Sequence, residues 1–228
     1  VSNAARILWI SEATRQDFLR FYPQALSRTT VDIPFRPQFS GTEAKQASEP
    51  PQVLLVNALD PRKNIDGIGK ALTSTANRQD MVLAVVGRER MPLSQALDNL
   101  KAISDLGIAV KWYRHASDEV LQWLYGGADV LLFPSYYEGL GLPILQAQAR
   151  GLPVVSSDTS SCVEVNLNPT LCAPPGDSSA IADMLCLALK KGEHVLRGGD
   201  LRAAQATFLA SRSAGARALV LDRNSIAT

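Results

Sequence analysis

The chain is short of histidine, cysteine and net charge, and each shortage argues against a class of function. Its 228 residues include three cysteines and two histidines, without a CxxC spacing. This pattern predicts neither a zinc site nor a disulfide framework, and it favours a reduced, cytoplasmic compartment. Structural or solvent roles are expected for His115 and His194 rather than catalysis. A formal net charge of +1 gives no support to nucleic-acid binding.

Long apolar runs are also missing. None approaches the roughly 18 residues that span a bilayer, so no integral membrane segment is expected. The first residues lack the basic region, apolar core and cleavage site of a secretory signal. Internal repeats and low-complexity tracts are absent from the sequence as well. With 46% hydrophobic and 20% charged residues, the chain has the composition of an ordinary soluble α/β protein.

What the sequence does contain is a series of short, β-branched apolar runs with amphipathic segments between them. The runs are residues 53–56, 82–86, 108–112, 130–133, 153–156 and 170–173. Continuous rather than alternating apolar runs indicate strands that are covered on both faces. The segments between them carry apolar residues at helical spacing, for example Leu93, Leu97, Leu100 and Ile103. The sequence therefore predicts an α/β fold with a doubly wound parallel sheet.

The first 51 residues follow a different pattern. An apolar run at 7–10 is suited to a strand, and Ser11 is placed to cap a following helix. One strand and one helix cannot form a domain alone. The segment 41–51 is polar and ends in two prolines, which is typical of a linker. We therefore expect a domain boundary at the linker, with the main domain at 52–228.

The most informative stretch is residues 128–155, which reads as strand, loop, helix and strand. The loop contains Glu138 among glycines, and the helix opens at Leu142 with a proline in its first turn. Loops at the carboxyl end of a parallel strand, leading into a helix N-terminus, are where α/β proteins hold phosphorylated ligands. Gln146 follows Glu138 by eight positions, so both side chains could face one crevice.

A second candidate site follows the first strand of the main domain. Pro61 favours a turn or the first position of a helix, and Arg62 and Lys63 come directly after it. Cations at a strand end near a helix start are placed to meet a phosphate. Gly87 ends the next strand and would lie at the same edge of the sheet.

Residues 128–155 resemble the donor-site motif of retaining GT-B glycosyltransferases of the group-1 (family 4) class. In that motif a Glu, seven residues and a second Glu span a loop and a helix. The resemblance implies that Glu138 contacts hydroxyls of the donor sugar. Gln146 stands where the second Glu accepts hydrogen bonds from the ribose, and its amide can still accept but carries no charge. The backbone that would meet the diphosphate comprises Gly139, Leu140, Gly141 and Leu142.

The segment 57–72 resembles the same family's phosphate-binding segment, which contains Pro-Arg-Lys-Asn or Pro-Arg-Lys-Gly. Lys63 matches the lysine that contacts the diphosphate, and Arg62 beside it is a further candidate for donor binding. Gly87 matches the loop that lies beside the nucleotide. Many members place an arginine directly after the glycine of the first loop, whereas this chain has Asn57 and Ala58 there.

The opening strand and helix resemble the last elements of the N-terminal half of these enzymes. The resemblance therefore implies a remnant of the N-terminal acceptor domain at 1–40, the linker at 41–51 and a nucleotide-sugar donor-binding domain with C-terminal helices at 52–228. We expect the isolated chain to be inactive, because a GT-B active site lies between two halves.

The implied function is transfer of a sugar, with retention, from a nucleoside diphosphate sugar to a glycan or lipid-linked acceptor. Glu138 and Lys63 would be the catalytic residues, with no bound metal or cofactor. The location would be cytoplasmic, with peripheral membrane association open. A non-catalytic GT-B-like nucleotide-sugar-binding protein, a sugar-nucleotide epimerase and a glycosyl phosphorylase remain alternatives, although the lysine segment that binds pyridoxal phosphate in phosphorylases is not recognised.

Overall fold

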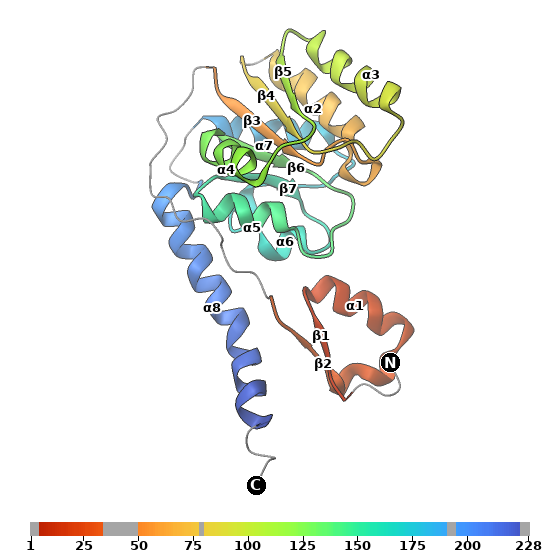
Figure 1. The fold of residues 1–228 in the computed structure, drawn as a ribbon, viewed down its shortest axis with the longest axis vertical. Coiled ribbons are helices and arrows are strands. Elements are labelled where there is room, and N and C mark those ends of the chain that lie inside the picture. The colour runs from red at the N-terminus through yellow and green to blue at the C-terminus, as the bar shows by residue number, and fades with distance from the viewer. Residues whose placement is uncertain (1–4, 34–49, 78–79, 191–194, 224–228) are drawn as a thin grey trace.

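A computed structural model describes residues 5–33, 50–77, 80–190 and 195–223. The body is a six-stranded sheet with the order β5-β4-β3-β6-β7-β8, and every neighbouring pair is parallel (Figure 1). The strands are β3 (Gln52–Val56), β4 (Val82–Val86), β5 (Ala109–Tyr113), β6 (Val130–Phe133), β7 (Val154–Ser157) and β8 (Cys172–Ala173). The doubly wound parallel α/β class expected from the sequence is confirmed.

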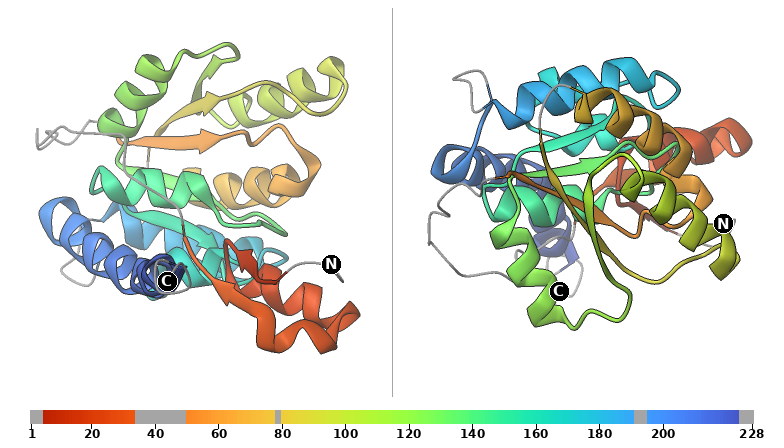
Figure 2. Two further views of the ribbon diagram at one scale, coloured as in Figure 1. Left: turned by 60° about the horizontal axis from the view of Figure 1, so that its bottom comes forward. Right: turned by 90° about the horizontal axis from the view of Figure 1, so that it is seen from above.

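Helices cover both faces of this sheet (Figure 2). One face is covered by α2 (Ile65–Ala76), α3 (Leu93–Ser104) and α7 (Ser178–Leu189). The other face is covered by α4 (Asp118–Gly127), α5 (Leu142–Ala149), α6 (Cys162–Val165) and the first part of α8 (Gly198–Arg223). Two hydrophobic cores result, one on each side of the strands.

Strand β3 shows why its residues form a central strand. Val53 and Leu55 belong to the core with α2, whereas Leu54 and Val56 belong to the core with α4 and α5. All four side chains are at most 5% exposed. A strand with both faces buried needs apolar side chains at every position, and burying each contributes about 1.5–3 kcal/mol.

A smaller unit precedes the body. It comprises β1 (Ile7–Trp9), α1 (Glu12–Phe21), the 3₁₀ helix η1 (Pro23–Arg28) and β2 (Thr29–Val31), and its two strands pair in parallel. The sequence predicted the first strand and the helix but not β2. Leu8, Phe21 and Leu26 are more than half exposed, so this unit does not bury its own apolar surface. Residues 34–49, which include most of the expected linker, lie outside the described residues, and the domain division stays a prediction.

Two further short helices, η2 (Pro61–Lys63) and η3 (Pro169–Leu171), lie in connections of the body. Helix α8 packs against α5 and then extends away from the sheet (Figure 1). Within the described residues, no helix combines the length and the apolar character needed to cross a membrane.

Candidate functional site

The site lies where the chain reverses its direction of travel across the sheet. From β3 the chain proceeds outward to β4 and β5, and it then returns to place β6 on the other side of β3. The connections that leave β3 and β6 therefore diverge and open a crevice at their carboxyl ends, the usual ligand position in such sheets. We call these connections the β3–α2 loop (residues 57–64) and the β6–α5 loop (residues 134–141).

An ion pair joins the two loops. Lys63 Nζ contacts Glu138 Oε1, and their side chains are only 12% and 14% exposed. The same ammonium group lies 4.5 Å from the centroid of the Phe133 ring, at the end of β6. Two residues 75 positions apart thus meet at the switch point of the sheet. The structure brings together the two side chains that the sequence proposed as catalytic.

Asn64 fixes the end of the β3–α2 loop. Its backbone is left-handed, with φ of 63°, and its side-chain oxygen accepts from Gly67 N at 3.1 Å at the start of α2. Its amide nitrogen donates to the carbonyls of Pro134 at 3.2 Å and Pro175 at 2.6 Å. Asn64 therefore caps one helix and ties the β3–α2 loop to the β6–α5 loop, which positions Lys63 next to it. Asn64 was not among the residues predicted to form the site, although an asparagine just before an apolar helix is a capping signal.

Arg62 is held differently from its neighbour Lys63. Its guanidinium pairs with Asp60 Oδ2 at 2.7 Å and is 66% exposed, whereas Asp60 is almost fully buried. The hydrogen bonds from Arg62 hold the pKa of the Asp60 carboxyl below its usual range. Asp60 also accepts from Arg62 N at 3.0 Å as the cap of η2. Ala58, where the family often has an arginine, is buried and only 3% exposed.

Gly87 lies in the wall of a pocket of about 340 Å³ beside the crevice. The pocket is lined by Val56, Asn57, Val86, Gly87, Arg88, Arg114, His115, Ala116 and Leu121. Gly87 has φ of 108°, and the Asn57 side-chain oxygen occupies the place where a Cβ would stand. Arg88 Nε donates to His115 Nδ1 at 3.2 Å across the pocket. Only glycine fits position 87, because of both its conformation and its close neighbour.

The remaining backbone candidates form the turn into α5. Gly141 is left-handed, with φ of 81°, and precedes the helix without a side-chain cap. Helices α1, α2, α4 and α7 each have a capping side chain, whereas α3 and α6 share with α5 the lack of one. Leu140 is buried, Leu142 is 49% exposed, and Gly139 faces Ile10 of the N-terminal unit. This helix end places positive potential at the edge of the sheet. Pro143 has no N–H, and the N–H groups of Ile144 and Leu145 donate to the Gly141 carbonyl.

Gln146 faces the neighbouring helix α4. Its Oε1 accepts from the hydroxyl of Tyr125 at 3.0 Å. Tyr125 is 1% exposed, and burial raises the pKa of its hydroxyl. Leu121, one helical turn before Tyr125, lines the pocket at Gly87. Gln146 therefore contacts α4 one helical turn away from the residue of α4 that lines the pocket.

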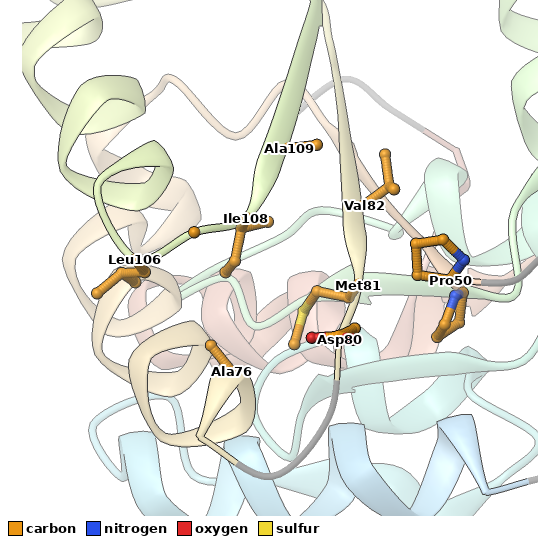
Figure 3. Close-up of a pocket in the computed structure, with 10 residues that line it drawn as sticks. Pro50, Ala76, Asp80, Met81, Val82, Leu106, Ile108 and Ala109 are labelled. Atoms are coloured by element: carbon orange, nitrogen blue, oxygen red, sulfur yellow. The ribbon is translucent and has the colours of Figure 1, made fainter.

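A roomier pocket lies at the opposite end of the sheet (Figure 3). It measures about 550 Å³ and is lined by Pro50, Pro51, Ala76, Asp80, Met81, Val82, Leu106, Gly107, Ile108 and Ala109. These residues stand at the amino ends of β3, β4 and β5, away from Lys63 and Glu138. Among the described residues that line it, none is a cation that could meet a phosphate. In the described part of the chain, no group of three or more histidine, cysteine, aspartate or glutamate residues is placed to hold a metal ion.

Fold and site together define a doubly wound α/β protein with a cation, a carboxylate and an open helix N-terminus at its switch point. A family model described as "Glycosyl transferases group 1" matches residues 41–199, well over half of the chain. The chain belongs to this family.

Two curated relatives and one solved structure illustrate the similarity. The chain is 29% identical to O-antigen chain mannosyltransferase B of Escherichia coli, covering 83% of this chain and 53% of that protein. It is 26% identical to the MMP alpha-(1->4)-mannosyltransferase of Mycolicibacterium hassiacum, covering 85% and 47%. Anabaena HepE, solved in complex with UDP and glucose, aligns with a TM-score of 0.75 and 17% identity, covering 95% and 63%. The chain thus spans about half the length of these curated relatives.

Proposed function

We propose that this chain is the donor-binding part of a retaining glycosyltransferase that uses a nucleoside diphosphate sugar. The observation that carries the proposal is the Lys63–Glu138 pair at the switch point, in front of the uncapped N-terminus of α5. A cation and a helix N-terminus suit a diphosphate, and a carboxylate beside them suits sugar hydroxyls. Membership of the glycosyltransferase family supports the same assignment.

The geometry suggests an order for the parts of the donor. The pocket at Gly87 would take the base, since it lies beside the crevice and is lined by Arg88 and His115. Gln146, one turn of α4 away, would meet the ribose. Lys63 and the backbone of residues 139–142 would meet the diphosphate, and Glu138 would accept from the sugar hydroxyls. Arg62 would add a second cation if its guanidinium left Asp60.

The main catalytic effect of these groups would be electrostatic. Negative charge grows on the diphosphate as its bond to the sugar breaks, and Lys63 together with the α5 N-terminus would stabilise that charge. Before the donor binds, Lys63 and Glu138 neutralise each other. Donor binding would exchange this pair for two new contacts, with phosphate on the lysine and sugar hydroxyls on the glutamate. None of these contacts requires a metal ion.

The proposal extends to the transferred sugar, the acceptor and the retaining stereochemistry. Two relatives bear the name mannosyltransferase, which favours a hexose such as mannose as the transferred sugar. The acceptor, a glycan or lipid-linked glycan, would bind to the other half of the full-length enzyme. A cytoplasmic location fits the three free cysteines and stays part of the proposal.

A thermal-shift panel of nucleoside diphosphates and their sugars tests the proposal. The expected result is a rise in the unfolding temperature with one nucleoside diphosphate and a rise at least as large with its sugar conjugate. No shift with any member of the panel would refute donor binding by this chain.

A second candidate is a non-catalytic nucleotide-sugar-binding protein with the same fold. The observations that favour it are Ala58 and Gln146, which replace two charged residues common in the family. Assays of the full-length protein separate the two, because a binding protein would hold the donor without turnover. An epimerase, the third possibility, would convert the donor in the absence of an acceptor.

A further inference from the structure

The backbone of Glu138 is held by two hydroxyl groups from another segment. Its N–H donates to Ser160 Oγ at 3.1 Å, and its carbonyl accepts from Ser161 Oγ at 3.0 Å. Both serines lie between β7 and α6, and Ser161 is fully buried. The connection after β7 therefore fixes the peptide groups on both sides of the Glu138 side chain.

A third hydroxyl reaches the same loop from the N-terminal unit. Ser11 Oγ donates to the Gly139 carbonyl at 2.6 Å, across 128 positions of sequence. The same atom accepts from Thr14 N at 3.2 Å and so caps α1. Ser11 is fully buried. One side chain thus joins the start of α1 to the carbonyl of the residue that follows Glu138.

Glu164 completes this arrangement from α6. Its two carboxylate oxygens accept from Glu12 N at 2.9 Å and Ala13 N at 2.6 Å, the first two N–H groups of α1. A carboxylate at this position accepts from two N–H groups that a helix leaves unpaired, and its negative charge interacts favourably with the positive end of the helix dipole. The backbone N–H of Glu164 donates to Ser161 O at 3.1 Å. The segment 160–164 therefore binds both the backbone of Glu138 and the N-terminus of α1.

We propose that Ser11 and Glu164 are positioning residues that couple the seating of the N-terminal unit to the geometry of the β6–α5 loop. With α1 seated on Glu164, Ser11 reaches the Gly139 carbonyl. Separation of the two units would leave both the carbonyl and the carboxylate without these partners. None of these bonds involves the β3–α2 loop or the pocket at Gly87. The N-terminal unit therefore acts on the β6–α5 loop, which would meet both the diphosphate and the sugar, and leaves the pocket at Gly87 unchanged.

The chain offers well-matched variants for a test. Ser11→Gly deletes the bond to Gly139 but costs little as a helix cap, since glycine is accepted there. Ser11→Thr retains the hydroxyl and should preserve the wild-type behaviour. Glu164→Gln keeps the size of the side chain and loses its charge and one acceptor. Ser117→Gly is the control, because Ser117 caps α4 through Val120 N and makes no bond to the β6–α5 loop.

The ligand measurement rests on the proposed function. In Ser11→Gly and Glu164→Gln, affinity for the nucleoside diphosphate sugar should fall about 3- to 10-fold, the scale of one net hydrogen bond. Affinity for the nucleoside alone should change less than about twofold, since its proposed contacts, the pocket at Gly87 and Gln146, are not involved in these bonds. An equal loss for both ligands, or no loss for the sugar conjugate, would overturn the positioning role.

Amide hydrogen exchange provides a second measurement that needs no ligand. Both variants should raise exchange at residues 138–142 as well as at the start of α1, whereas Ser11→Thr and Ser117→Gly should leave residues 138–142 as in the wild type. Unchanged exchange at 138–142 in both variants would overturn the coupling. If the wild-type chain binds no nucleotide, the proposed function fails, and the exchange result still decides whether the coupling exists.

Discussion

Lys63→Met removes the charge at the centre of the site and keeps an apolar stem of similar length. In the free protein the variant leaves Glu138 without its cation, in a place where both side chains are nearly seven-eighths buried. In the complex it removes the contact proposed for the diphosphate. The lost contact and the uncompensated Glu138 charge beside the phosphates both weaken the complex. They oppose the gain from no longer having to break the ion pair, and a net loss of affinity for a nucleoside diphosphate is expected.

The magnitude follows from these two contributions. Loss of one hydrogen bond to a charged group costs about 1.5–3 kcal/mol, which corresponds to about a 10- to 150-fold rise in Kd. An unneutralised Glu138 adds repulsion toward the phosphates. The double variant Lys63→Met with Glu138→Gln removes that repulsion, so it should bind the nucleoside diphosphate more tightly than Lys63→Met alone.

Titration calorimetry on folded protein measures these changes. Lys101→Met is the matched control, because Lys101 pairs with Asp105 at 2.6 Å on the exposed surface of α3, where an ion pair contributes little. The control should bind as the wild type does. An unchanged affinity in Lys63→Met would refute the reasoning, since the phosphates would then have to lie elsewhere.

Three other variants or assays address separate parts of the site. Gln146→Glu should modestly strengthen the binding of ribonucleoside diphosphates, because the carboxylate can accept hydrogen bonds from both Tyr125 and the ribose. The affinity for dideoxy analogues should increase clearly less, and equal increases by calorimetry would show that residue 146 does not contact the ribose hydroxyls. Asp60→Asn should lower the free energy of unfolding by about 1–2 kcal/mol at pH 7. Because the folded-state pKa of Asp60 is lowered, the stabilisation by its carboxylate is present above the unfolded pKa of about 3.9 and is lost as the pH falls through the folded value. Urea unfolding at pH 3 should therefore show a smaller difference in unfolding free energy between the wild type and Asp60→Asn. An equally large difference at pH 3 would contradict this role of Asp60. The isolated chain, given a donor mixture and native acceptors, should form no product, and sugar transfer would contradict a site divided between two halves.

The strands and the helix caps of the body could be predicted because they depend on local chemistry. Continuous apolar runs marked strands that are buried on both faces, as in β3 and β6. The expected cap Ser11 accepts from Thr14 N in the first turn of α1, and Ser117 and Asp177 cap α4 and α7 in the same way. These features need only a few neighbouring residues, which the sequence displays directly.

Depth of burial could not be predicted in the same way. Leu93 and Leu97 were expected to face the core, but they are 42% and 49% exposed. Helix α3 packs beside β5, the edge strand of the sheet, so only part of its apolar stripe is covered. Trp123 on α4 is large and apolar, yet it is 63% exposed. Periodicity identifies a face of a helix but does not say how far the neighbouring layer extends.

The site could be predicted in its parts but not in its connections. Lys63 and Glu138 were each placed at the carboxyl edge from their strands, yet no sequence rule reports that they form an ion pair. Asn64 and Ser160 were missed for the same reason, because their partners come from distant segments. For Ser160, the only signal in the sequence was the polar run after β7. Long-range hydrogen bonds require the folded arrangement of the strands.

A crystal structure of the chain with its nucleoside diphosphate sugar tests the central claim most directly. The diphosphate is expected at the N-terminus of α5, in contact with Lys63 Nζ, and the sugar is expected within hydrogen-bonding distance of Glu138. A ligand bound at the amino end of the sheet, in the pocket between Pro50 and Ala109, would contradict the claim that the switch point is the donor site.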